Sequence, residues 1–296
     1  MTAAVGKKEV RGGNVEMGRK IKDSFLLGLI YLTSFFSVML LAGILLYVFV
    51  RGFPGISRSF LTTVSSARRG TAGIAGNLVN TCYLVVLTLM IAVPIGIGSA
   101  IWLNEYAKRS RWIQMIEFAT ETLAGIPSIV FGLFGMVFFG TTLGLGYSIL
   151  TGSLTLSLMI LPLITRNTQE ALRAVPDSYR SGAVGMGAGK WHMIRTILLP
   201  AAMPGIATGV LLAVGRIVGE SAALLFTAGS GYLLPGHGRG LLHKVRESGG
   251  TLAVQLYLSM SRAEYDAAFG IAAVLLCLVL FFHILTRFLS DRMGCL

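Results

Sequence analysis

Charged residues are scarce in this chain, and several long stretches contain none at all. They make up 13% of the 296 residues, against roughly 25% in a soluble globular domain. A helix crosses the hydrocarbon core of a membrane with about 20 consecutive apolar residues, so each charge-free stretch is long enough to span it. The composition therefore argues against a water-soluble domain and predicts an integral membrane protein. The charge-free stretches include 24–50, 70–104, 122–165 and 267–286.

Residues for metal binding and catalysis are equally sparse. The three cysteines have no C-x-x-C spacing, which excludes a disulfide framework, and the four histidines lack metal-ligand spacing. The glycine-rich segment 185–190 does not match the phosphate-binding loop G-x-x-x-x-G-K-[ST], because Val184 and Trp191 stand at two required positions. No Ser-His-Asp grouping or acid pair lies in the charge-free stretches. We therefore expect that this chain is not an enzyme, holds no metal or cofactor and does not itself bind ATP.

Long apolar runs predict an all-α fold with about six membrane-spanning helices. The stretch 122–165 is long enough for two spans, and a turn-rich centre at 141–146 divides it. A short helix is also expected at 251–261, between the last two spans. The predicted spans are 24–50, 78–103, 124–141, 146–165, 204–227 and 267–287.

The distribution of basic residues predicts the orientation of these spans. The net charge is +12. Lys and Arg are retained in cytoplasmic loops, and sixteen of them lie on the cytoplasmic side if both termini are cytoplasmic, against eight on the outer side. We therefore predict a cytoplasmic segment at 1–23, a transmembrane domain at 24–290 and a cytoplasmic tail at 291–296. The first apolar stretch is too long for a cleavable signal peptide.

One predicted cytoplasmic loop, 166–203, is unusually long and polar. Its helix-forming stretches are interrupted at Val175-Pro176 and again at Gly185–Gly189, and Trp191 stands among basic residues near its end. Such an amphipathic segment is typical of a helix that lies on the membrane surface or docks into a partner's groove. A solvated connector is the alternative interpretation.

Two charged residues, Arg216 and Glu220, lie inside the predicted fifth span. A charge at mid-bilayer costs roughly 2.5–3.5 kcal/mol, and the i,i+4 spacing predicts that both side chains share one helix face. Small residues continue that face at Gly205, Gly209 and Ala213, which indicates close helix packing. The pair is either a structural ion pair or part of an anion pathway. In such a pathway Arg216 binds an oxyanion, and Glu220 holds Arg216 in place or responds to the protonation of the substrate.

Prolines inside two other predicted spans, Pro127 and Pro162, predict locally broken helices. Broken segments are tolerated in membranes where they line a cavity or are buried in protein. Ser128, directly after Pro127, is therefore a further pathway candidate. Packing at a simple kink is the alternative interpretation.

The end of the long loop resembles the cytoplasmic signature of binding-protein-dependent ABC importer permeases. The resemblance rests on Gly187 and, ten positions later, the run from Ile197 to Leu199-Pro200; the family's Glu-Ala-Ala falls on Ser181-Gly182-Ala183, of which only the alanine is kept. It implies a MetI-like permease architecture in which residues 182–195 form a coupling helix that docks on a separate ATPase. The implied coupling residues are Ser181, Gly182, Ala183, Gly187, Trp191, Ile197, Leu199 and Pro200.

Three further blocks, 104–107, 123–135 and 219–229, resemble the permease of the phosphate-specific importer, the PstA type more than the PstC type. The resemblance implies ATP-driven import of inorganic phosphate by alternating access in a bacterial or archaeal cytoplasmic membrane. The implied partners are a PstC-type permease, a PstB-type ATPase dimer that binds ATP and Mg, and an extracytoplasmic phosphate-binding protein. Nucleic acid is not an expected partner.

Three alternatives from the residues themselves stay open. The first is a permease for another oxyanion such as molybdate, tungstate or sulfate. The second is a membrane-embedded enzyme, and the third is a regulatory or assembly subunit whose partner carries out transport.

Overall fold

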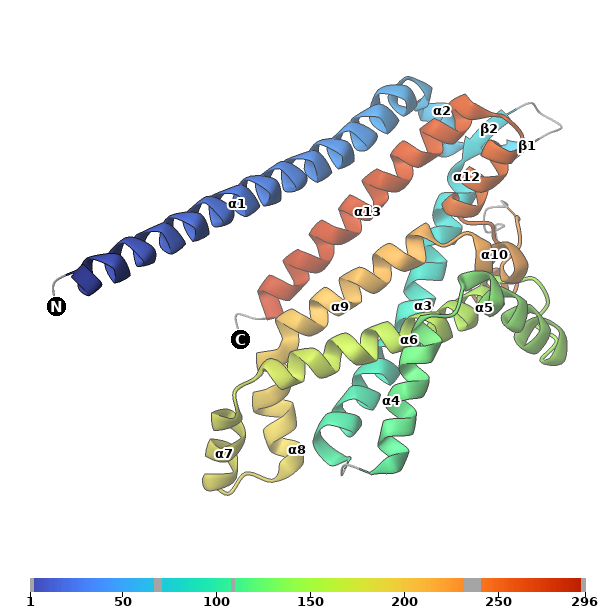
Figure 1. The fold of residues 1–296 in the computed structure, drawn as a ribbon. Coiled ribbons are helices and arrows are strands. Elements are labelled where there is room, and N and C mark those ends of the chain that lie inside the picture. The colour runs from blue at the N-terminus through green and yellow to red at the C-terminus, as the bar shows by residue number, and fades with distance from the viewer. Residues whose placement is uncertain (1–2, 67–70, 108–109, 232–240, 294–296) are drawn as a thin grey trace. The chain divides into compact units, whose positions relative to one another are not determined.

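The computed structural model is almost entirely helical (Figure 1). It describes residues 3–66, 71–107, 110–231 and 241–293, and side chains over 22–64, 73–107, 110–231 and 243–288. The helices are α1 (Ala3–Gly52), α2 (Arg58–Thr62), α3 (Ala75–Ile101), α4 (Arg111–Ala124), α5 (Ser128–Gly135), α6 (Ile149–Ala174), α7 (Asp177–Gly185), α8 (Lys190–Met193), α9 (Leu199–Gly219), α10 (Ala222–Thr227), α11 (Leu241–Val245), α12 (Leu252–Ser261) and α13 (Tyr265–Met293). Shorter turns are the 3-10 helix η1 (Phe53–Gly55) and the π-helical η2 (Trp102–Tyr106), η3 (Met136–Thr142) and η4 (Ile194–Leu198); the strands are β1 (Val64–Ser66) and β2 (Thr71–Ile74).

The chain divides into two compact units, residues 1–51 and 52–296. The first unit is α1, whose described side chains are mostly apolar and exposed. A helix that is apolar on all sides suits lipid or a protein partner better than water. The predicted boundaries at residues 23 and 290 fall inside α1 and α13. They stay predictions, because the structure does not describe the side chains before Lys22 or those of the tail 291–296.

Five described helical segments are long and apolar enough to cross a membrane, and α4 with α5 and η3 forms a sixth if this bent pair is one span. The prediction of about six spans is confirmed in this sense. The small antiparallel ladder of β1 and β2 is an addition that we did not predict. The five segments are Lys22–Gly55, Ala75–Tyr106, Ile149–Ala174, Lys190–Gly219 and Tyr265–Phe288.

The predicted third span, 124–141, differs most from the structure. Helix α4 ends at Ala124, and the chain turns by 101° before α5 and η3 continue to Thr142. Pro127 explains the break, because the residue before a proline is disfavoured in the helical conformation. The break predicted at Pro127 is therefore confirmed. Pro162, in contrast, lies inside the unbroken helix α6, so the break predicted there is wrong.

Helix α6 lies at the centre of the second unit and packs against α3 on one side and α9 on another (Figure 1). Leu156, Ile160 and Ile164 of α6 are fully buried in this core. The contact with α9 is close, because a Cβ atom at Gly209 would lie 2.7 Å from the Cβ atom of Asn167. The prediction that small residues on α9 mark a packed helix face is confirmed by Gly209 and by Ala213, which is also fully buried.

The long polar loop begins later than we predicted. Helix α6 is capped by Ser148, whose hydroxyl accepts a hydrogen bond from the backbone N–H of Thr151, and it runs without interruption from Ile149 to Ala174. It ends at the predicted Val175-Pro176 break, and α7 follows. A turn then forms at Gly187, whose φ of +80° lies in the left-handed region that favours glycine. The interruption predicted at Gly185–Gly189 is therefore confirmed, and the implied coupling segment 182–195 holds the end of α7, the turn, α8 and the start of η4.

The opposite end of the unit carries the short helix predicted at 251–261. Helix α12 covers Leu252–Ser261 and is capped by Thr251, whose hydroxyl accepts a hydrogen bond from the N–H of Val254. Asn80 of α3 is fully buried and donates hydrogen bonds to the carbonyls of Gly231 and Gly250. A buried side chain of α3 thus holds the loop that leads into α12.

The close contact between α5 and α10 predicts an unequal effect of two glycine substitutions. A Cβ atom at Gly132 would lie 2.8 Å from the Cα atom of Ala223, whereas a Cβ atom at Gly98 would meet nothing within 4 Å. Gly132→Ala should lower the free energy of unfolding by about 1–3 kcal/mol, as overpacking does. Gly98→Ala should leave it unchanged or raise it by up to about 1 kcal/mol.

Thermal unfolding midpoints of the two purified variants and the native chain, in the same detergent, measure the difference. Equal midpoints for Gly132→Ala and Gly98→Ala would contradict the described packing of α5 on α10.

Candidate functional site

The predicted intramembrane pair, Arg216 and Glu220, does not share a helix face. Helix α9 ends at Gly219, and Glu220 follows in an extended conformation with φ −77° and ψ 126°. The Glu220 carboxylate accepts a hydrogen bond from the backbone N–H of Ala223 at 3.1 Å. Because a new helix begins with N–H groups that have no partner inside it, this bond favours ending α9 and starting α10 here. The prediction of one continuous span over 204–227 with both charges on one face is therefore wrong.

Arg216 lies on the exposed side of the last turns of α9. Within the described residues no ion pair joins Arg216 to Glu220 or to any other carboxylate within 4 Å. A Cβ atom at Gly215 or Gly219 would meet nothing within 4 Å, so no helix of the described residues packs closely against this part of α9. The Arg216 guanidinium presents planar N–H donors, and such donors suit phosphate-like oxyanions.

Ser128 is the first residue of α5, directly after the bend at Pro127, and its side chain is half-buried. Helix α5 packs against α10 through Gly132 and Ala223. The structure thus brings together the two helices that begin at the two chain breaks. A pathway role for Ser128 stays a prediction.

The predicted coupling residues fall into a buried and an exposed group. Ala183 is buried against Leu172 and Ile194, while Ile197 and Leu199 are half-buried beside them. The remaining residues face outward. The segment from α7 to α8, residues 177–193, is called the α7–α8 loop below. Its large apolar side chains Val184, Met186 and Trp191 are exposed. Exposed apolar side chains gathered on a polar loop are typical of a protein contact surface. The outward-facing predicted residues are Ser181, Gly182, Gly187, Trp191 and Pro200.

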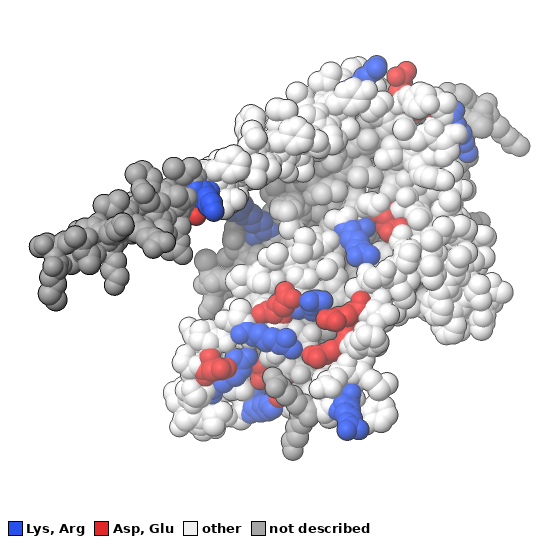
Figure 2. All heavy atoms as spheres, viewed as in Figure 1, with Lys and Arg blue, Asp and Glu red and all other residues white. Residues whose placement is uncertain are grey.

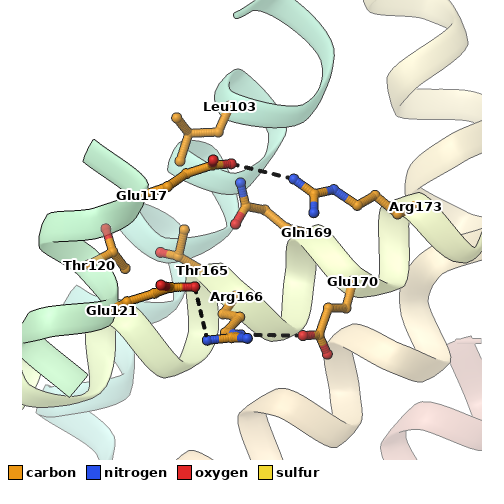
Figure 3. Close-up of a pocket in the computed structure, with 9 residues that line it drawn as sticks. All are labelled: Leu103, Glu117, Thr120, Glu121, Thr165, Arg166, Gln169, Glu170 and Arg173. Carbon is orange, nitrogen blue, oxygen red and sulfur yellow. Dashed lines mark hydrogen bonds and ion pairs between the residues drawn. The ribbon is translucent and has the colours of Figure 1, made fainter. Parts of the chain in front are cut away.

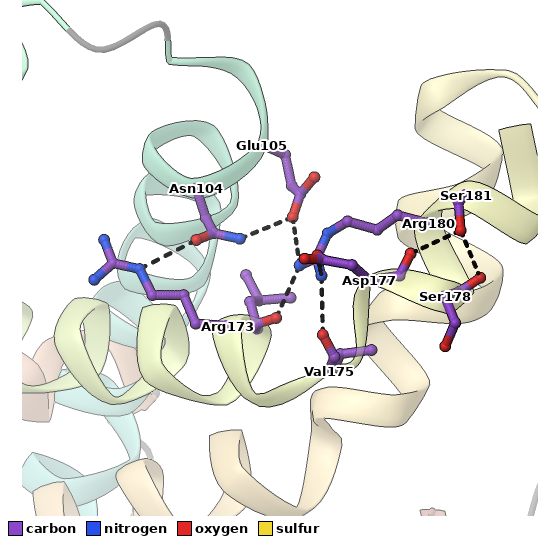
Figure 4. A network of polar contacts seen from close by, with 9 residues as sticks. Asn104, Glu105, Arg173, Val175, Asp177, Ser178, Arg180 and Ser181 are labelled. Atoms are coloured by element: carbon purple, nitrogen blue, oxygen red, sulfur yellow. Dashed lines mark hydrogen bonds and ion pairs between the residues drawn. The ribbon is translucent and has the colours of Figure 1, made fainter.

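A polar network that we did not predict joins the end of α3 to this loop (Figure 4). Arg180 of α7 donates to the Glu105 carboxylate at 3.1 Å and to the backbone carbonyls of Leu172 and Val175, each at 2.9 Å. It also pairs with Asp177 at 3.2 Å. One guanidinium therefore holds the end of α3, the end of α6 and the start of α7.

Glu105 is the centre of this network on the α3 side. Its carboxylate also accepts a hydrogen bond from the side chain of Asn104 at 2.8 Å. The Lys190 ammonium of α8 donates to the Glu105 carbonyl oxygen and lies 4.7 Å from the centre of the Tyr106 ring. Arg173 of α6 donates to Asn104 at 3.4 Å.

The Glu105–Arg180 pair is far less exposed than the other Arg–Glu pairs of the described residues. The side chains of Glu105 and Arg180 are 7% and 22% exposed, whereas those of the other Arg–Glu pairs are 43–64% exposed. Exposed pairs contribute about 0–1 kcal/mol, while removing one partner of a buried pair costs about 3–5 kcal/mol. Among these pairs, Glu105–Arg180 therefore contributes most to holding the loop in place.

A pocket of about 160 Å³ lies beside the network, between α4 and α6 (Figure 3). Arg166 pairs across it with Glu121 at 3.5 Å and along α6 with Glu170 at 3.4 Å, and Arg173 pairs with Glu117 at 3.4 Å. Figure 2 shows the charged atoms of this face gathered over α4, α6 and α7. The pocket is lined by Leu103, Glu117, Thr120, Glu121, Thr165, Arg166, Gln169, Glu170 and Arg173.

A sequence signal for this polar region did exist. Glu105 and Arg166 are the first charged residues after the charge-free stretches 70–104 and 122–165, and the predicted topology puts both on the same side of the membrane. Their partners could not be named, because Arg180 lies 75 residues from Glu105 in sequence. Only the folded chain brings them together.

The hydrogen bond at the α9–α10 break predicts different effects of two substitutions at Glu220. Glu220→Ala removes the acceptor for the Ala223 N–H, and the free energy of unfolding should fall by about 1 kcal/mol, as for a lost helix cap. Glu220→Gln keeps an oxygen acceptor and should match the native chain. Thermal unfolding midpoints in detergent measure both, and a native midpoint for Glu220→Ala would show that the bond does not stabilise the start of α10.

Comparison with known proteins adds to this geometry. Residues 92–294 match the family described as binding-protein-dependent transport system inner membrane component. The chain is 38% identical over 213 residues to the probable ABC transporter permease protein YqgI of Bacillus subtilis, which covers 72% of each chain. It is 32% identical over 290 residues to the phosphate transport system permease protein PstA of Mycobacterium leprae, which covers 94% of this chain and 92% of that one.

Among solved structures, the chain resembles one in a bacterial alginate ABC transporter in complex with alginate pentasaccharide-bound periplasmic protein. The TM-score is 0.68 at 15% sequence identity, and the match covers 92% of this chain and 96% of that chain. At this identity the likeness shows the fold alone.

Proposed function

The chain belongs to the family of binding-protein-dependent transport system inner membrane components, and from this premise we propose that it carries inorganic phosphate into the cell. It is a multi-pass permease subunit of an ABC importer in the inner membrane. Relatives that bear the name phosphate transport system permease protein PstA support phosphate as the cargo.

Arg216 is the observation that carries this proposal. It is a cation in an apolar helix, at the point where α9 is interrupted, and no carboxylate of the described residues pairs with it within 4 Å. Because such a charge is costly in hydrocarbon, it needs water, a partner chain or an anion beside it. Glu220 follows at the break and keeps the local charge balanced, which suits passage of phosphate better than tight binding.

The open face of α9 around Arg216 supports a pore shared with a second permease. Gly215 and Gly219 leave space there for a neighbouring helix. We propose that a PstC-type permease packs on this face, so that phosphate passes between the two chains, with Ser128 a further pathway residue. In this proposal both termini and the α7–α8 loop lie in the cytoplasm.

The outward-facing apolar residues of the α7–α8 loop, Val184, Met186 and Trp191, support docking of a partner. In this proposal the partner is a PstB-type ATPase dimer that binds ATP and Mg, and the chain itself catalyses nothing. A phosphate-binding protein delivers the cargo at the opposite end, where α12 lies. ATP shifts the pore between outward-facing and inward-facing states by binding differently to the complex in each.

ATP-driven uptake of labelled phosphate into proteoliposomes that hold the complete complex tests the proposal. Arg216→Gln should lower uptake at least about tenfold, since a charge-assisted contact is lost, while the complex still assembles and hydrolyses ATP. Arg58→Gln removes the same charge from the exposed helix α2 and should change uptake by less than about twofold.

Three results would overturn parts of the proposal. Native uptake by Arg216→Gln, or failure of that variant to assemble, excludes the pathway role. Uptake of sulfate, molybdate or tungstate in place of phosphate identifies another oxyanion as the cargo. An assembled native complex that takes up none of these anions indicates a regulatory or assembly subunit.

A further inference from the structure

The α7–α8 loop is attached to the rest of the bundle by the chain at both ends and by two noncovalent contacts. Helix α6 leads into the loop, and η4 with α9 leads out of it. One noncovalent contact is an apolar cluster that holds Ala183 and Met193 of the loop and has Ile97 and Ile101 of α3 packed against it. The other is polar and joins both limbs of the loop to Glu105, in the turn that continues α3. Arg180 on α7 binds the Glu105 carboxylate, and Lys190 on α8 binds the Glu105 carbonyl oxygen.

Arg180 makes more hydrogen bonds than the arginine of an isolated surface ion pair. Besides Glu105, it donates to the carbonyls of Leu172 and Val175, where α6 ends and the chain turns at Val175-Pro176. With Glu105 and Arg180 at 7% and 22% exposure, water competes little for these bonds. The loop therefore cannot tilt relative to the end of α3 without breaking the hydrogen bonds of Arg180 and Lys190 to Glu105.

The position of Glu105 connects the α7–α8 loop to helix α3. It lies in η2, a π-helical turn that continues α3, and π-helical turns are frequent at functional sites. Helix α3 packs along α6 in the core of the unit. A movement of the loop that reached the bundle only through the backbone would act on α6 and α9, whereas the link at Glu105, beside the apolar packing of Ile97 and Ile101, adds a polar connection to the end of α3.

We propose that Glu105 and Arg180 form a coupling link, which makes the end of α3 move as one body with the α7–α8 loop. Glu105 is then a positioning residue for transport: it touches neither cargo nor nucleotide and determines how much of the ATPase movement reaches the spans. The inference rests on the proposed function only in that the α7–α8 loop receives the movement of a partner ATPase.

Asp177 supplies a matched control within the same network. It pairs with the same Arg180 at 3.2 Å, but its side chain is 98% exposed. Glu105→Gln and Asp177→Asn each remove one negative charge and keep the shape of the side chain. Only the first takes a charge away from the α3 end of the link.

Reconstituted complete complexes, assayed for phosphate uptake and ATP hydrolysis in the same vesicles, test the link. Glu105→Gln should keep ATP hydrolysis while phosphate taken up per ATP falls at least about fivefold, the lower range of coupling effects. Asp177→Asn should keep the native ratio within about twofold. A native ratio for Glu105→Gln overturns the inference, and so does an equal fall for both variants.

A second measurement leaves Glu105 in place, in case Glu105→Gln fails to assemble. Spin labels at Tyr106→Cys and Ser181→Cys, in a chain whose native cysteines are replaced by serine, report the distance between the end of α3 and α7. The distance should be the same in nucleotide-free and ATP-bound complexes. A shift between the two states shows that the loop moves away from α3 and overturns the link.

The native complex separates this outcome from that of the proposed function. If it takes up no phosphate, the cargo assignment fails, yet the spin-label distances in the two nucleotide states still test the link. If it takes up phosphate and Glu105→Gln does so with the native ratio, the link fails and the cargo assignment stands.

Discussion

The close packing of α6 against α3 and α9 is the constraint on which the rest of the second unit depends. Helix α6 is buried on several sides, because Gly96 of α3 and Gly209 of α9 allow the neighbouring backbones to approach it. Association of helices in a membrane is driven by such packing, since lipid tails are as apolar as leucine and give little hydrophobic gain. Small residues at these contacts therefore decide which helices are neighbours, and both candidate regions of the molecule are positioned by α6.

The two regions differ in how the chain accommodates polar groups. At the α9–α10 break, the extended conformation of Glu220 frees backbone groups in the membrane, and the Glu220 side chain satisfies one of them. Irregular backbone in a membrane is tolerated where it lines a cavity or is buried in protein, which agrees with a pore beside Arg216. At the other region, Arg180 satisfies carbonyls at the end of α6 with a largely buried guanidinium. The first region is suited to cargo and the second to transmitting movement.

The approximate number of spans could be predicted from the sequence, because most of them need only a charge-free run of sufficient length. Local rules also gave the break at Pro127, the end of α6 at Val175-Pro176 and the helix α12. They also gave the interruption at Gly185–Gly189, where Gly187 turns the chain. The same kind of rule failed at Pro162, where α6 continues unbroken, because whether a proline interrupts a helix depends on what packs around it.

At the candidate site, too, local sequence features predicted one part and the tertiary structure decided the rest. The sequence by itself determined a membrane protein with an arginine and a glutamate in one apolar stretch, and the motifs that resemble an importer permease, because composition and spacing are local properties. Only the tertiary structure decided that Arg216 and Glu220 do not pair and that Glu105 meets Arg180 instead. The reason is that a hydrogen bond to a helix start and an ion pair across 75 residues depend on distances in space, which spacing along the chain does not define.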